Sequence, residues 1–168
     1  LPINPIKEFL DSKTSFSLLK LLDEDKTSLE AMYYRGNYFL YGLGDPEKAL
    51  AEFKKILPKN PNFILAHYDL AVAYRDLGML EKAIGQYEKT LELNPDFPEA
   101  LSNLGGYYFR EGKLDEAVKL FKKAIQVYPN FIQALSNLGA ALNKQGHHDE
   151  AVPLLKKVLA LNPDFAIA

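Results

Sequence analysis

A spacing of 34 residues runs through this sequence and constrains its fold more than any other feature. Prolines, glycines, alanines and phenylalanines all recur at this spacing, in the series Pro61, Pro95, Pro129 and Pro163; Gly44, Gly78, Gly112 and Gly146; Ala49, Ala83, Ala117 and Ala151; and Phe63, Phe97, Phe131 and Phe165. Such regularity indicates one supersecondary unit repeated along the chain.

Each unit reads as two helices. Between successive prolines the apolar residues fall at helical spacing, in two runs that the glycine separates. The glycine suits the end of the first helix, where a positive φ is usually needed, and the proline cannot continue the second. The recurring alanine is small enough to let the two helices approach closely. The pattern predicts paired helices over 64–77 and 80–92, 98–111 and 114–126, and 132–145 and 148–160.

The first unit departs from this pattern. Its helices are expected over 29–42 and 46–57, but Gly36 lies one residue early relative to its counterparts, and we expect the turn at 42–44 to absorb the extra residue. The units are expected to span an N-terminal helical cap or degenerate repeat at 1–29, a divergent first repeat at 30–63, further repeats at 64–97 and 98–131, and a fourth with the start of a following helix at 132–168.

The repeated units resemble the tetratricopeptide repeat (TPR) family over about residues 30–165. The third unit carries the family's pattern most fully, at Leu104, Gly105, Tyr108, Gly112, Ala117, Phe121, Ala124 and Pro129. The resemblance implies an all-α fold, a right-handed superhelical solenoid of antiparallel helix pairs.

Composition argues against several other classes of function. The net charge of −2 does not suit a nucleic-acid partner, and no apolar run is long enough to span a membrane. The chain has no cysteine, so thiolate metal sites and disulfides are excluded. His147 and His148 lack a third ligand and are interpreted as a solvated turn, and His67 as a packed core residue. We therefore expect no catalytic residues, no metal and no cofactor.

The TPR resemblance also implies where a partner would bind. In that family the first helix of each repeat lines a concave groove. Carried onto this sequence, the candidate peptide-binding residues are Tyr33, Tyr34, Asn37 and Tyr41 in the first unit, Tyr68, Asp69 and Arg75 in the second, Ser102, Asn103, Phe109 and Arg110 in the third, and Ser136, Asn137, Asn143 and Lys144 in the fourth.

Two modes of TPR recognition can be compared with these residues. The clamp that chaperone-binding TPR domains close on a terminal carboxylate is incomplete, because Tyr68 and Ser102 occupy lysine positions. An asparagine ladder, similar to that in the TPR region of O-linked N-acetylglucosamine transferase, is matched by Asn103 and Asn137 and broken by Asp69. Such amides could grip a peptide backbone, since they both donate and accept hydrogen bonds. The alternative is that these asparagines follow the family consensus and are solvated.

Three functions follow from this reading. The first is a scaffold that binds a protein or peptide segment in the concave groove. The second is a recognition or regulatory region of a larger enzyme, such as a glycosyltransferase. The third is a scaffold that assembles with itself, as a homo-oligomer joined through an uncapped C-terminal end, where Phe165 and Ile167 begin a further helix.

Overall fold

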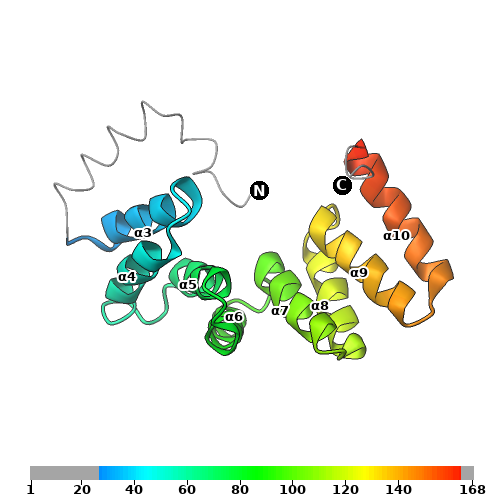
Figure 1. Ribbon diagram of the computed structural model, residues 1–168, viewed down its shortest axis with the longest axis horizontal. Helices are drawn as coiled ribbons and strands as arrows, with labels where there is room; N and C mark the ends of the chain where they lie inside the picture. The colour runs from blue at the N-terminus through cyan, green and yellow to red at the C-terminus, as the bar shows by residue number, and fades with distance from the viewer. Residues whose placement is uncertain (1–26, 164–168) are drawn as a thin grey trace. The chain divides into compact units, whose positions relative to one another are not determined.

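The computed structural model describes residues 27–163, and within them all regular structure is helical (Figure 1). The elements are α3 (Leu29–Asn37), the π-helix η1 (Tyr38–Gly42), α4 (Pro46–Ile56), α5 (Ile64–Asp76), α6 (Leu80–Leu93), α7 (Pro98–Arg110), α8 (Leu114–Val127), α9 (Ile132–Lys144) and α10 (His148–Leu161). The expected cap or degenerate repeat at the N-terminus, and the helix start at Phe165 and Ile167, lie outside the described residues.

The chain divides into two compact structural units, which are larger than the single repeats of the sequence. The boundary lies between Gln86 and Tyr87, inside α6. In the first, called unit 1, α3 packs against α4 and α4 against α5. In the second, called unit 2, α7 packs against α8, α8 against α9, and α9 against α10. Each unit therefore consists of successive helices packed against their sequence neighbours, as a solenoid of helix pairs requires.

The recurring glycines end the first helix of each pair, as expected. Gly44, Gly78, Gly112 and Gly146 have φ values of 64°, 70°, 76° and 86°. After α5, the Met79 amide donates to the Tyr74 carbonyl oxygen over 2.9 Å, which is the backbone bond of a Schellman cap. A side chain with a Cβ would strain this left-handed conformation, so the glycine determines where each pair turns.

The recurring alanine is buried in every pair, and so is the aromatic residue four positions later in the first three pairs. Ala117 and Phe121 of α8 are buried in a cluster with Leu138 and Leu142 of α9. A Cβ placed on Gly105 of α7 would lie 2.7 Å from the Phe121 ring, so the missing side chain lets the two helices close on the aromatic residue.

The first repeat makes the same contact between a glycine and an aromatic ring, with one additional residue in the chain between them. Gly36 is placed against the Phe53 ring just as Gly105 is placed against Phe121, but Gly36 and Phe53 are one residue further apart in sequence. The π-helix η1 absorbs that residue, with the Leu43 amide donating to the Tyr38 carbonyl oxygen over 3.0 Å. The expectation that the turn at 42–44 would absorb it was wrong, because the helix widens before the turn.

Two glycine substitutions at equivalent positions should have opposite outcomes. Gly105→Ala is expected to cost about 1–2 kcal/mol of unfolding free energy, because the new methyl group overpacks against the fully buried Phe121 ring. Gly139→Ala should be neutral or slightly stabilising. Its new methyl group meets Cδ2 and Cγ of Leu155, a side chain that is 38% exposed and can move, while alanine favours the helix.

Urea denaturation followed by far-ultraviolet circular dichroism measures both effects. Because the two substitutions make the same chemical change in the same repeat position, each is the control for the other. Equal losses of stability in the two variants would contradict the role assigned to the Phe121 ring.

Candidate functional site

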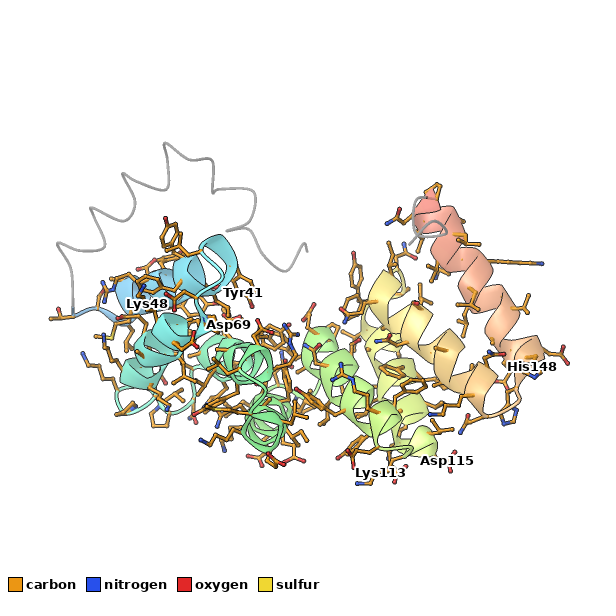
Figure 2. The ribbon with its side chains drawn as sticks, in the orientation of Figure 1. Tyr41, Lys48, Asp69, Lys113, Asp115 and His148 are labelled. Carbon is orange, nitrogen blue, oxygen red and sulfur yellow. The ribbon has the colours of Figure 1, made fainter. Side chains whose placement is uncertain are left out.

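A buried carboxylate joins three elements of unit 1. Asp69 of α5 is only 3% exposed, and it accepts a hydrogen bond from the Tyr33 hydroxyl of α3 over 2.8 Å and one from the Tyr41 hydroxyl of η1 over 2.6 Å. Figure 2 shows the labelled Tyr41 and Asp69 side chains close together. The π-helix brings Tyr41 to this position, so the first repeat is tied to α5 by its irregular segment.

Burial is the main influence on the ionisation of this group. It raises the pKa of Asp69 to about 6, although the hydrogen bonds from Tyr41 and Tyr33 act in the opposite direction by stabilising the carboxylate. Burial also raises the pKa of both tyrosines, and the nearby Asp69 carboxylate raises it further. At neutral pH the cluster therefore holds one carboxylate and two neutral phenols.

Several candidate groove residues of unit 1 are occupied by contacts within the chain. Asn37 is buried and donates from its Nδ2 to the Tyr33 carbonyl oxygen over 3.0 Å. Arg75 forms an ion pair of 2.8 Å with Asp76. Tyr34 and Tyr68 are partly buried. The structure thus places Asn37 and Asp69 beneath the surface, and a partner could touch them only after displacing what covers them.

The candidates of unit 2 lie on the first helices of two neighbouring repeats, α7 and α9, which contact each other. Ser102 is 1% exposed, and its hydroxyl has no hydrogen-bond partner among the described residues. The others remain accessible to different degrees. Partly buried are Asn103, Phe109, Ser136 and Asn137; exposed are Arg110, Asn143 and Lys144.

Aromatic and cationic side chains connect the C-terminal ends of these two helices. The Lys144 Nζ of α9 lies 5.0 Å from the centroid of the Phe109 ring of α7. The Arg110 guanidinium lies 5.5 Å from the centroid of the Tyr107 ring. The Asn143 Oδ1 atom lies 2.6 Å from His148 Nδ1. The C-terminal ends of α7 and α9 therefore present an aromatic ring with a cation against it.

Comparison with known protein families agrees with the repeat pattern. Models described as "Tetratricopeptide repeat" match residues 30–62, 52–85 and 96–164, and a model described as "TPR repeat" matches 73–110. Residues 30–164 are tetratricopeptide repeats. These TPR repeats form a protein-interaction scaffold. Curated proteins gave no match to the sequence.

Solved TPR-type structures resemble the chain over most of its length. A structure titled "Crystal structure of MamA" has a TM-score of 0.74 and 27% identity, and covers 92% of this chain and 90% of its own. A structure titled "MamA 41-end from Desulfovibrio magneticus RS-1" has a TM-score of 0.72 and 23% identity, with coverages of 90% and 85%. These likenesses agree with the helical TPR fold.

Other polar residues of the TPR chain have structural explanations. His67 is packed as expected, with Nδ1 2.7 Å from Gln86 Oε1 and Nε2 2.8 Å from the Pro61 carbonyl oxygen. Within residues 27–163 no group of three His, Cys, Asp or Glu side chains is placed to hold a metal ion. No helix in that range has the length and apolar character needed to cross a bilayer.

The sequence did not predict that the Tyr41 hydroxyl donates to Asp69, nor that Arg35 and Glu52 form a buried ion pair. One signal was present: Asp69 replaces the asparagine found at Asn103 and Asn137, in the repeat next to a tyrosine-rich helix. A carboxylate at this position accepts from two phenols at once, whereas an amide oxygen and amide nitrogen would present one acceptor and one donor.

Proposed function

We propose that this TPR chain is a non-catalytic scaffold whose α7–α9 face holds an extended segment of a partner protein. The observation that carries the proposal is the repetition of a Ser-Asn pair at the same register of two adjacent helices, Ser102 with Asn103 and Ser136 with Asn137. Both asparagines are partly exposed. Amides repeated one helix apart suit the peptide groups of an extended backbone, which also repeat a donor and an acceptor.

The side chains at the C-terminal ends of the same two helices favour a segment that carries both apolar and acidic residues. Phe109 offers an aromatic surface, and aromatic residues tend to dominate the energy of binding. Among the described residues, neither Arg110 nor Lys144 has a carboxylate within ion-pair distance. Both cations lie against aromatic rings instead. Each can therefore meet a carboxylate of the partner, and binding should weaken as salt concentration rises.

The test uses a peptide selected on the intact chain from a random-peptide display library. We expect the double variant Asn103→Ala with Asn137→Ala to bind this peptide about tenfold more weakly than wild type in fluorescence anisotropy, which corresponds to about 1.4 kcal/mol. Its thermal unfolding midpoint should stay close to that of wild type, because both side chains are partly exposed and neither carries the packing of the core.

A matched control removes two amides from the neighbouring helix and its following loop. Gln126→Ala with Asn130→Ala changes exposed residues at the end of α8, and it should leave peptide affinity unaltered. If the asparagine variant and this control bind the peptide equally well, the asparagines follow the family consensus without gripping a backbone, and the proposed binding face is wrong.

The same asparagine pair favours one second candidate. It resembles the asparagine ladder of the TPR region of O-linked N-acetylglucosamine transferase, so the chain would serve as the substrate-recognition part of a larger glycosyltransferase. The peptide-binding face would be the same in both cases. The difference is testable by assaying the protein in which these repeats naturally occur for glycosyl transfer to the selected peptide.

A further inference from the structure

Helix α7 contains two adjacent glycines, and packing within the chain explains only the first. A Cβ on Gly105 would lie 2.7 Å from the Phe121 ring, whereas a Cβ on Gly106 would meet no atom within 4 Å among the described residues. Neither glycine has a positive φ. Because glycine is less favourable than alanine in a helix interior, Gly106 costs stability without a gain in packing or in turn geometry.

Gly106 lies on the side of α7 that carries the proposed peptide-binding residues. It follows Asn103 by three residues and precedes Phe109 by three, and residues at this spacing share one side of a helix. The same position holds Val72 in α5 and Ala140 in α9, so both neighbouring repeats have a side chain there. A helical glycine without a packing role indicates a place where another molecule comes close to the backbone.

Ser102, one turn before Gly106, is a second residue that costs the free protein stability. It is 1% exposed, and its hydroxyl has no hydrogen-bond partner among the described residues. An unpaired buried hydroxyl is unfavourable, and a polar group that reaches it recovers the lost hydrogen bond. Helical side chains lean toward the N-terminus, so a side chain at position 106 would cover the turn that holds Ser102. The missing side chain and the unpaired hydroxyl therefore lie next to each other.

Resting on the proposed function, we propose that the turn from Ser102 to Gly106 anchors the bound segment. One large apolar side chain of the segment enters the space that Gly106 leaves beside Phe109, and the adjoining peptide group pairs with the Ser102 hydroxyl. An apolar side chain suits this space because its floor is helix backbone, whose amide and carbonyl groups are already paired within α7. The anchor selects for sequence, whereas the asparagines hold the backbone of any sequence.

The test measures affinity and stability together, with the display-selected peptide as the probe in fluorescence anisotropy. Gly106→Leu fills the space and should weaken peptide binding by about tenfold or more. Its thermal unfolding midpoint should be at or above that of wild type, because leucine is more favourable than glycine in a helix. Ser102→Ala should also raise the midpoint, and should weaken binding by about threefold, the loss of one hydrogen bond. A residue with a purely structural role would not show this opposition of stability and affinity.

Gly85 of α6 provides the matched control. It also lies inside a helix, and a Cβ on it would also meet no atom within 4 Å among the described residues. Gly85→Leu should therefore raise the unfolding midpoint as Gly106→Leu does, and it should leave peptide affinity unchanged. Equal affinities of the two leucine variants for the peptide would overturn the proposed anchor.

An alanine scan of the peptide identifies the side chain that enters the space. Replacing one large apolar residue should weaken binding to wild type by about tenfold. The same replacement should change affinity for Gly106→Leu little, because the space is already filled in that variant. Equal effects on both proteins at every apolar position of the peptide would contradict the anchor.

The double variant Asn103→Ala with Asn137→Ala separates this proposal from the proposed function. If it weakens peptide binding and Gly106→Leu does not, the α7–α9 face is correct and the anchor is wrong. If neither variant weakens binding, the peptide lies elsewhere and both proposals fail.

Discussion

Arg35→Ala is expected to destabilise unit 1 by about 3 kcal/mol, because it leaves a buried carboxylate without its main partner. The Arg35 Nε and Nη2 atoms of α3 both lie 3.2 Å from Glu52 Oε2 of α4. Both side chains are about nine-tenths buried. Lys55 still contacts Glu52 Oε1 from the exposed side and retains part of the stabilisation, so the loss should fall at the lower end for a broken buried pair.

Urea denaturation gives the loss in unfolding free energy, and amide hydrogen exchange of α3 and α4 shows where it occurs. Lys55→Ala is the matched control. It removes the half-exposed partner of the same carboxylate and should cost less than about 1 kcal/mol. Replacing Arg35 and Glu52 together with methionine should recover most of the lost stability. A small effect of Arg35→Ala, similar to that of Lys55→Ala, would show that water reaches Glu52.

The second large effect expected is a dependence of stability on the protonation of Asp69. The pKa of Asp69 is raised to about 6 in the folded chain from an ordinary value of 3.8. Between these values the folded chain binds more protons than the unfolded chain, so this group makes the protein less stable as pH rises from about 4 to about 6, and has no further effect above that range. The difference corresponds to about 3 kcal/mol.

Asp69→Asn should remove this contribution, because the amide cannot ionise. We expect wild type to gain unfolding free energy relative to the variant by up to about 3 kcal/mol as the pH falls from 7 to 4, measured by urea denaturation at each pH. Comparing the two proteins cancels the titration of every other carboxylate.

A second variant tests whether the tyrosines act on this carboxylate. Tyr41→Phe should move the midpoint of the transition to higher pH, because it removes a hydrogen bond that stabilises the ionised form. Parallel pH profiles for wild type and Asp69→Asn would show that Asp69 titrates alike in the folded and unfolded states.

Most of the helical framework could be predicted from the sequence. The expected helix over 98–111 is observed as α7, Pro98–Arg110, and the expected helix over 148–160 is observed as α10, His148–Leu161. Local signals define both helices. A glycine that takes a positive φ lies near one end of each, and an apolar pattern of helical period runs along it. Each such signal acts within one or two turns of chain, so neighbouring residues suffice to read it.

The candidate site was only partly predictable, because burial is decided between helices. Asn103 and Asp69 occupy the same repeat position, yet Asn103 is partly exposed and Asp69 is buried beneath two tyrosines. What differs is the neighbouring helix: the tyrosines that cover Asp69 come from α3 and η1. The position of a residue in the repeat determines the direction in which its side chain points, but the residues opposite determine what the side chain contacts.

The 34-residue repeat by itself determined that this chain forms helix pairs, where each pair turns, and which alanines and aromatic residues pack at their centre. Only the tertiary structure decided how the first repeat accommodates its additional residue, that Arg35 pairs with Glu52, and that Asp69 is withdrawn from solvent. The physical reason is the distance along the sequence over which each effect acts. Backbone conformation responds to the nearest residues in sequence, whereas desolvation, ion pairing and packing depend on side chains that meet only after the helices have stacked.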